Sequence, residues 1–243
     1  MTKNLPAMTH AQRMARAAEK AGTLLQFLGS GEVYTTAPIV ADLLQIDRSR
    51  AIACLRALEK QGALKSEQQY FNAREQRIYG ITPHGIAMAD TFDCPHFELG
   101  RTNAGYIQHR LDTQRVHIAA MKAGWTDWTA ERLLRMQALK KVPDAVGTDT
   151  TGKRVAIEIE LNAKTPKRYA EFIVKHLLEI KAGKYAEVHF VCPATVKTYV
   201  ENAFRKVVSV KFNGEVVPLE AKHRAPFRFF SFDEWPVKKQ EAK

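Results

Sequence analysis

Residues 154–161 read Arg154-Val155-Ala156-Ile157-Glu158-Ile159-Glu160-Leu161, an alternation of apolar and charged side chains that is typical of a β-strand. Because successive side chains of a strand point to opposite faces, the apolar residues at odd-numbered positions share one face. Glu158 and Glu160 share the other face, where their like charges repel each other. The pair therefore needs a positive partner, and a divalent cation is one that carboxylate oxygens bind directly.

A third acid precedes this strand. Lys141 to Val146 has the character of another strand with Asp144 near its start, and residues 149–153 (Asp-Thr-Thr-Gly-Lys) predict a turn between the two strands. Such a hairpin brings Asp144 to Glu158 and Glu160, so that three carboxylates can bind Mg²⁺ or Mn²⁺. A metal site of this kind activates water and stabilises the charge that develops on a phosphate. The alternative is an exposed hairpin whose polar face is acidic for no functional reason.

The composition favours a polyanionic partner. Lys and Arg number 37 against 26 Asp and Glu, a formal net charge of +11, and such a surplus attracts nucleic acid. Three widely spaced cysteines without a CxxC pattern argue against a zinc ribbon or a disulfide framework. The N-terminus lacks the apolar core of a signal peptide, and no apolar run reaches the roughly 18–20 residues that span a bilayer. We therefore expect a cytoplasmic protein without membrane insertion.

The first 93 residues have the pattern of a winged helix-turn-helix. Three helices are predicted, followed by a β-hairpin and a short closing helix, at residues 10–28, 36–44, 48–61, 63–82 and 83–91. The stretch Tyr79-Gly80-Ile81-Thr82-Pro83-His84-Gly85-Ile86-Ala87 resembles the strand-to-helix ending that is common in this family. We expect this domain at residues 1–93, a linker at 94–104 and a second domain at 105–243.

The third predicted helix is the element that would enter the major groove of DNA, because an α-helix fits that groove and can contact base edges there. Its outward side chains include Arg48, Ser49, Arg50 and Arg56, and the hairpin adds Arg74 and Arg77 for contacts with phosphate. The alternative is that the domain serves only protein contacts or dimerisation.

In the second domain, helices and strands alternate, which predicts an α/β (α+β) fold with a mixed central sheet. Helices are expected at residues 104–123, 130–138, 165–184 and 194–207, and further strands at 186–192, 209–212 and 227–232. Lys164, Lys167 and Arg168 crowd the beginning of the helix at 165–184, where free backbone N–H groups also favour anions. This cluster is either a phosphate clamp or a solvated basic face.

The pattern Pro143-Asp144, followed after 13 residues by Glu158-Ile159-Glu160, resembles the PD-(D/E)xK nuclease superfamily, whose core has the order αβββαβ. The usual pattern ends in Lys, which is replaced by Glu160 here, as in some restriction endonucleases of the superfamily. The resemblance implies metal binding by Asp144, Glu158 and Glu160. It further implies charge stabilisation by Lys164 and an additional acid, Glu131, on the preceding helix.

Most of the chain also resembles the replication-relaxation family, which includes the MobC-type relaxases of mobilisable plasmids. The resemblance rests on the order of the winged helix, residues 125–135, Val142 to Val146, Val155 to Leu161 and Lys164 to Tyr169. It implies nicking of one DNA strand at a transfer origin, within a relaxosome of accessory and coupling proteins. The substrate would be double-stranded and locally single-stranded plasmid DNA.

Tyr169 lies about one helical turn beyond Lys164 and is the candidate for a covalent nucleophile, although a packed ring is the alternative. Two other functions fit the same motifs. One is a sequence-specific DNA-binding regulator or replication-initiation factor with an inactive nuclease-like domain. The other is a restriction-type nuclease that makes double-strand breaks.

Overall fold

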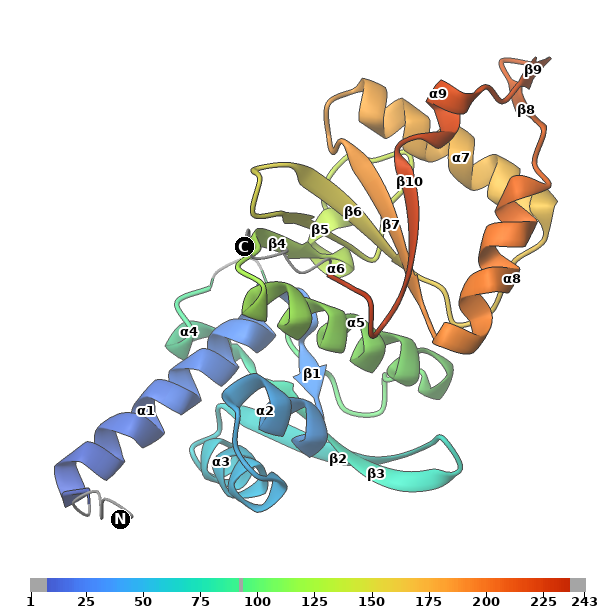
Figure 1. The fold of residues 1–243 in the computed structure, drawn as a ribbon. Coiled ribbons are helices and arrows are strands. Elements are labelled where there is room, and N and C mark those ends of the chain that lie inside the picture. Colours follow the sequence, from blue (N-terminus) through green and yellow to red (C-terminus); the bar gives the residue numbers. More distant parts are fainter. Residues whose placement is uncertain (1–7, 92–93, 237–243) are drawn as a thin grey trace, which may run out of the picture. The chain divides into compact units, whose positions relative to one another are not determined.

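The computed structural model describes residues 8–91 and 94–236 of the chain. The chain divides into two compact units, Met1–Ile107 and Gln108–Lys243, each shown in Figure 1. The division falls inside helix α5 (Ala104–Lys122) rather than in the linker expected at residues 94–104. Every helix within the described ranges is too short or too polar to cross a membrane.

The first unit has the predicted order of three helices, a hairpin and a closing helix. Its elements are α1 (His10–Phe27), the π-helical turn η1 (Leu28–Glu32), β1 (Tyr34–Thr35), α2 (Ala37–Leu44), α3 (Arg48–Lys60), β2 (Leu64–Phe71), β3 (Arg74–Ile81) and α4 (Pro83–Met88). The sequence did not predict η1 or β1, and β1 adds a third strand to the hairpin in the antiparallel order β1-β3-β2.

Side-chain caps fix where the helices of this unit begin. The Asp47 carboxylate accepts from the backbone N–H of Arg50 (2.9 Å), and Thr82 accepts from Gly85 (3.1 Å). Each cap satisfies a backbone donor that has no partner inside its helix. Asn72 and Ala73, both with positive φ, form the tight turn of the β2–β3 hairpin.

The segment at residues 94–103, expected as a linker, contains no helix or strand but packs onto the first unit. Phe97 is buried, and its backbone N–H donates to the Ile81 carbonyl oxygen (2.8 Å). A Cβ atom added to Gly80 would lie 2.0 Å from the Phe97 ring, so Gly80 is the residue that lets this ring approach the sheet.

The second unit is built on a five-stranded mixed sheet in the order β10-β7-β6-β5-β4. Three strands form an antiparallel meander, β4 (Thr126–Ala130), β5 (Ala145–Thr148) and β6 (Arg154–Ile159). The other two, β7 (Glu187–Cys192) and β10 (Phe227–Ser231), run parallel to β6. The predicted α/β class with a mixed central sheet is confirmed.

Helices cover both faces of this sheet. Ala156 packs among residues of α7 (Pro166–Lys181) and α8 (Ala194–Arg205), whereas Val155, Ile157 and Ile159 pack against α5. Glu158 and Glu160 share the face of Ala156, so their buried side chains lie in the interior on the side that α7 and α8 cover. The alternative of an exposed acidic hairpin is therefore wrong.

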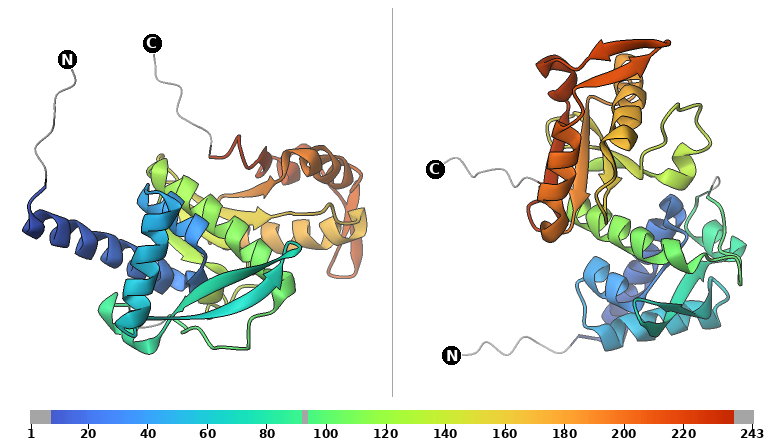
Figure 2. Two further views of the ribbon diagram at one scale, coloured as in Figure 1. Left: turned by 90° about the horizontal axis from the view of Figure 1, so that it is seen from below. Right: turned by 90° about the vertical axis from the view of Figure 1, so that its right-hand side faces the viewer.

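Two predicted elements differ from the structure, whereas the strand expected at residues 209–212 is confirmed. The helix expected at residues 130–138 is one turn, α6 (Glu131–Leu134), and it follows strand β4, which the sequence did not predict. The strand expected from Lys141 begins only at Ala145, which leaves Asp144 just before β5. The strand at 209–212 is β8 (Ser209–Phe212), which pairs with β9 (Glu215–Pro218) in a ribbon apart from the central sheet (Figure 2). After β9, the single turn α9 (Ala221–Arg224) precedes β10.

Replacing Phe97 by Ala should lower the free energy of unfolding by about 3 kcal/mol, because a fully buried aromatic ring is removed. The control is Leu99→Ala, in the same segment, where the side chain is 53% exposed and the expected change is within about 0.5 kcal/mol. Urea unfolding followed by circular dichroism measures both. Equal small effects would show that the segment does not pack on the first unit.

Candidate functional site

Strand pairing brings Asp144, just before β5, near Glu158 of β6 and Glu160, just after β6. Ala145 pairs with Ile157, and the backbone N–H of Asp144, one residue earlier, donates to the Ile157 carbonyl oxygen (3.0 Å). The Asp144 carboxylate accepts from the backbone N–H of Ile159 (2.7 Å). Glu158 and Glu160 are only 4% and 2% exposed. The carboxylates of Glu158 and Glu160 are thus buried in the helix-covered part of the sheet.

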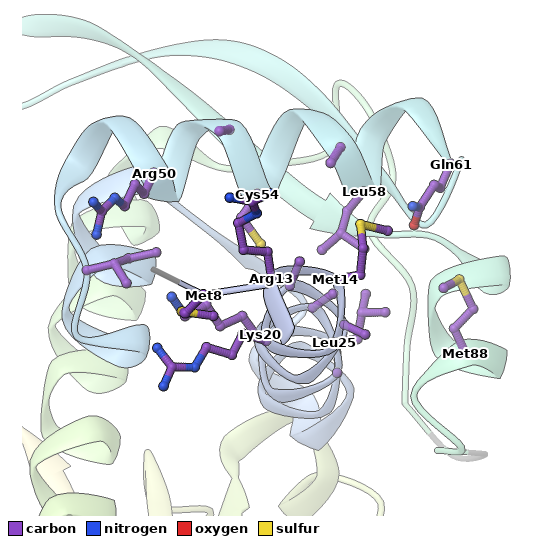
Figure 3. A pocket seen from close by; sticks show the side chains of 18 residues that line it. Met8, Arg13, Met14, Lys20, Leu25, Arg50, Cys54, Leu58, Gln61 and Met88 are labelled. Atoms are coloured by element: carbon purple, nitrogen blue, oxygen red, sulfur yellow. The ribbon is translucent and has the colours of Figure 1, made fainter. Parts of the chain in front are cut away.

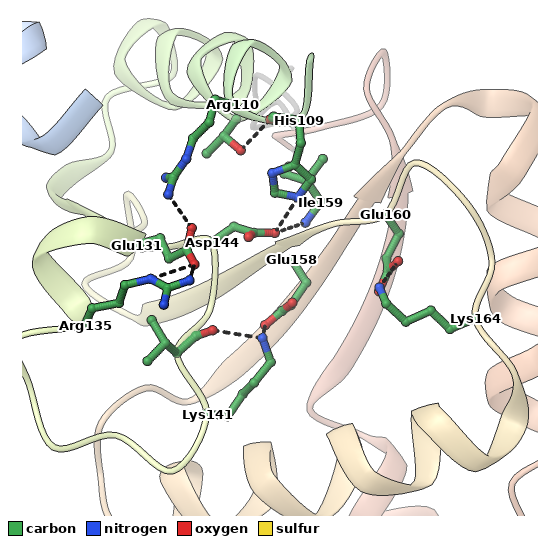
Figure 4. A network of polar contacts seen from close by, with 12 residues as sticks. His109, Arg110, Glu131, Arg135, Lys141, Asp144, Glu158, Ile159, Glu160 and Lys164 are labelled. Carbon is green, nitrogen blue, oxygen red and sulfur yellow. Dashed lines mark hydrogen bonds and ion pairs between the residues drawn. The ribbon is translucent and has the colours of Figure 1, made fainter. Parts of the chain in front are cut away.

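Glu158 lies beside two basic side chains that the sequence pattern did not indicate, Lys141 and His176. The Lys141 Nζ atom lies 2.5 Å from Glu158 Oε1, and His176 Nε2 lies 3.1 Å from the same oxygen (Figure 4 shows the lysine). His176 is fully buried on α7, and its Nδ1 is 2.7 Å from the Tyr185 hydroxyl. Burial acts to raise the pKa of Glu158, but the charges of Lys141 and His176 outweigh it and lower that pKa.

Glu160 has a different partner. Its two carboxylate oxygens contact the Nζ atom of Lys164, in the loop that leads to α7 (Figure 4). Burial raises the pKa of Glu160 to about 7 despite this contact, and the charges of Glu158 and Asp144 act in the same direction. The three acids are therefore close enough to interact electrostatically.

Helix α5 supplies partners for the other acids. His109 Nε2 lies 3.4 Å from Asp144 Oδ2, and Arg110 lies 2.6 Å from Glu131. Arg135 donates to Glu131 from Nε (3.0 Å). Burial lowers the pKa of His109, but the hydrogen bond and charge of Asp144 outweigh it and raise that pKa. Glu131, the predicted helix-borne acid, is thus paired with two arginines (Figure 4).

The carboxylate oxygens have the chemistry that Mg²⁺ or Mn²⁺ requires, but the arrangement of the side chains does not fit a shared ion. Among the described residues, no group of three or more His, Cys, Asp and Glu side chains is placed to hold a metal. Asp144, Glu158 and Glu160 are each turned toward a different internal cation (Figure 4). Lysine and histidine therefore offset the repulsion for which the sequence analysis invoked a metal.

Tyr169 belongs to the core. The side chain is fully buried, its ring packs edge-on against Phe190 and Phe204, and its hydroxyl accepts from the backbone N–H of Lys164 (3.3 Å). Burial, with the charge of Glu160, raises the pKa of Tyr169 above its usual range. The assignment of Tyr169 as a nucleophile is therefore corrected, because the hydroxyl is shielded and is harder to ionise.

Some basic side chains at the beginning of α7 are exposed, and basic side chains also surround an aromatic ring there. Lys167 and Arg168 are exposed, as a phosphate clamp and a solvated face would both require. Arg168 also lies 5.7 Å from the Phe172 ring centroid, while the Nζ atoms of Lys141 and Lys164 lie 5.0 and 5.1 Å from it. Sequence patterns did not predict this cluster, because Lys141 is brought to it only by the tertiary fold.

The predicted DNA-binding residues of the first unit fall into two sets. Arg48 and Arg56 of α3 line a groove of about 390 Å³ together with Arg74 and Arg77 of the hairpin. Helical spacing accounts for the pairing within α3, because residues eight apart lie on one face. Four of the six predicted residues therefore share one surface.

The other two residues, Ser49 and Arg50, belong to the cap of α3. Ser49 donates to Asp47 (2.5 Å) and Arg50 forms an ion pair with the same side chain (3.1 Å). Arg50 lines a second groove of about 930 Å³ between α1 and α3, which Arg13 and Lys20 also border (Figure 3). Arg50 therefore lines a different groove from Arg48 and Arg56.

Comparison with known proteins adds little. No protein-family model matches the chain, and no curated protein is similar to it. A solved structure of a Lactococcus lactis ZitR mutant in the apo form is similar over 35% of this chain and 70% of its own, with 18% identity and a TM-score of 0.27. A likeness this slight carries no argument about fold or function.

Because the folded state raises the pKa of Glu160 to about 7, the unfolded chain ionises this carboxyl first as the pH rises. The folded state therefore loses stability through this group between its ordinary pKa and about 7, by up to about 3 kcal/mol. Glu160→Gln should remove the effect, so the variant should gain stability over the parent protein more at pH 8 than at pH 5. Unfolding by urea at both pH values measures this.

The control for that prediction is Glu171→Gln, which removes an exposed carboxyl from α7. A stability difference for Glu160→Gln that is the same at both pH values, like that expected of the control, would contradict the raised pKa.

Proposed function

We propose that the chain is a DNA endonuclease that nicks one strand of a plasmid at its transfer origin. The observation that carries the proposal is the cluster of half-buried Asp144 with buried Glu158 and Glu160, the last in contact with Lys164, where the antiparallel pair β5–β6 meets the parallel strand β7. Carboxylates beside a lysine at a strand junction are the groups that the PD-(D/E)xK resemblance implies. The element order α5, β4, β5, β6, α7, β7, with the single turn α6 between β4 and β5, also supports a nuclease-like unit of the αβββαβ type.

The chemistry of these groups suits attack on a phosphate. A Glu160 carboxyl with a pKa of about 7 can take or release a proton near neutral pH, as a general acid or base must. The Lys164 ammonium beside it supplies positive charge for the phosphate oxygens. Mg²⁺ or Mn²⁺ belongs to the proposal as a cofactor to be tested. We assign it no step, because the acids do not converge on one point.

Recognition of the origin falls to the first unit in this proposal, acting as a winged helix-turn-helix. The groove between α3 and the hairpin brings four arginines together, Arg48, Arg56, Arg74 and Arg77. Arginine forms bidentate hydrogen bonds with guanine edges and with phosphate. By the same resemblance, the enzyme would act within a relaxosome of accessory and coupling proteins.

Nicking provides the test of the catalytic half. Asp144→Ala and Glu160→Ala should abolish conversion of supercoiled origin plasmid to open circle while leaving binding to the same DNA intact. Glu171→Gln is the control and should nick normally. The assay, read on an agarose gel after denaturant and protease, is run with Mg²⁺, Mn²⁺ and a chelator. Nicking that is unchanged in both alanine variants would reject the proposal, and a linear product would favour a restriction-type nuclease.

Arg56→Ala should weaken binding to origin duplex about tenfold, because it removes a donor from the groove that faces the hairpin. Arg50→Ala is the matched control, since it removes the same charge from the same helix but from the other groove. Fluorescence anisotropy at a fixed salt concentration measures both affinities. Equal losses for the two variants would show that general charge, and not this groove, accounts for binding.

One observation favours a second candidate, a DNA-binding regulator or replication-initiation factor with an inactive nuclease-like unit. Each of the three acids already has an internal cationic partner, so the cluster is stable without a metal or a substrate. Specific binding without nicking under any of the metals would support this candidate over the nuclease.

A further inference from the structure

The first unit has a groove between α1 and α3 that the proposed function does not use. It has a volume of about 930 Å³, and Met88 of α4 also lines it. Small side chains make up much of the remaining lining, among them Ala17 and Ala21 of α1 and Ala53 and Ala57 of α3. Small residues on two neighbouring helices leave space for the larger side chains of a third helix.

Larger apolar side chains extend from the core to the rim of this groove. Leu25 and Leu58 line it and are buried, whereas Met14 and Met88 line it with exposed fractions of 58% and 47%. Methionine is flexible and polarizable, so it adapts to the shape of a bound partner. Large apolar side chains gathered at one exposed groove are typical of a protein-binding surface.

Basic side chains border the same groove. Arg13, Arg16 and Lys20 of α1 are three, four and seven residues apart, a spacing that places them on one face of the helix. Within the described part of the chain, none of these three forms an ion pair, and none of the residues that line the groove is acidic. Arg50 of α3 adds a fourth charge, which it shares with Asp47 (3.1 Å). The groove therefore combines uncompensated positive charge with apolar surface.

The basic and apolar side chains lie on different sides of the groove. In the view of Figure 3, Arg13, Lys20 and Arg50 lie on the left, and Met14 and Met88 lie on the right. This division fits an amphipathic helix that carries acidic residues beside an apolar face. Duplex DNA would contact only the basic side, because its phosphates gain nothing from methionine and alanine.

The chain itself does not supply a segment of the complementary charge. Residues 1–7 contain one lysine and no acid, and residues 237–243 contain three lysines and one glutamate. A second copy of this chain, with a net charge of +11, would bring the same basic face of α1 to the groove. Like charges that meet at an interface disfavour association. Charge complementarity therefore points to a different, acidic protein.

We infer that the groove between α1 and α3 binds an acidic amphipathic helix of another protein. The apolar side chains of that helix occupy the space over the alanines and contact Met14 and Met88, while its carboxylates pair with Arg13, Arg16 and Lys20. The inference goes beyond the proposed function, because it depends neither on nicking nor on the arginines that face the hairpin.

The test is a fluorescence anisotropy titration of a labelled peptide with the full-length protein. The peptide has about 18 residues, long enough to form a helix, with leucines at helical spacing on one face and glutamates on the other. A second peptide has lysine in place of every glutamate. The glutamate peptide should bind, and the lysine peptide should not.

Two alanine positions of α1 give matched variants of the protein. Ala17→Glu places a larger, negative side chain in the groove and should weaken binding of the glutamate peptide about tenfold. Ala15→Glu introduces the same side chain at an exposed position two residues away, on nearly the opposite face of α1, and should bind as the parent protein does. Circular dichroism checks that both variants fold.

Arg13→Ala separates this groove from the one that faces the hairpin, and it tests the inference even if Ala17→Glu folds poorly. It should weaken binding of the glutamate peptide about threefold and leave binding of duplex DNA unchanged. Arg56→Ala should have the reverse effects, because Arg56 lines only the groove beside the hairpin.

Failure of the glutamate peptide to bind would overturn the inference, as would equal losses of affinity for Ala17→Glu and Ala15→Glu. Two further results would overturn it by assigning another occupant. Displacement of the peptide by duplex DNA, with weaker DNA binding by Ala17→Glu than by Ala15→Glu, would assign the groove to DNA. A dimer of the parent protein in sedimentation velocity, dissociated by Ala17→Glu but not by Ala15→Glu, would assign it to a second copy.

Discussion

The burial of two like charges on one strand is the constraint on which the second unit depends. Glu158 and Glu160 point into the interior beneath α7, and an unpaired buried carboxylate costs several kcal/mol even after the protein relaxes. The chain therefore has to bring cations to them from outside the sheet. Lys164 comes from the loop before α7, His176 from α7 itself and Lys141 from the segment before β5. The side chains that cover this face of the sheet are therefore polar and basic as well as apolar.

The acids and their basic partners are held in place in different ways. The acids are fixed by backbone pairing, which strand register makes rigid, whereas their partners stand on longer side chains from loops and helices. In the proposed nuclease, these basic side chains are the groups that a phosphate would attract.

Local sequence rules predicted much of the framework. The alternation in residues 154–161 placed Glu158 and Glu160 on one face, and the helices expected at residues 48–61 and 165–184 begin within one residue of α3 and α7. Strand β4 was missed because its polar side chains lack a clear alternation, and pairing with β5 decides its conformation.

The partners of the acids could not be predicted for a similar reason. The contacts of Lys141, His109 and His176 arise from packing between distant segments, which no periodicity records. The placement of Arg50 and Arg56 on different grooves could have been predicted, because their spacing along α3 already puts them on different faces of the helix. The burial of Tyr169 depends on the rings of β7 and α8 that close over it.

The arginine-lined groove of the first unit and the buried acid cluster of the second unit should respond differently to ionic strength. In the proposed function, the arginines between α3 and the hairpin would bind phosphates with release of condensed counter-ions, a contribution that falls steeply as salt increases. The ion pairs of Glu158 and Glu160 are shielded from solvent and are screened far less. Salt would therefore dissociate the protein from DNA long before it disturbed the buried cluster, so that occupancy of the target, and not the integrity of the site, becomes the salt-limited step.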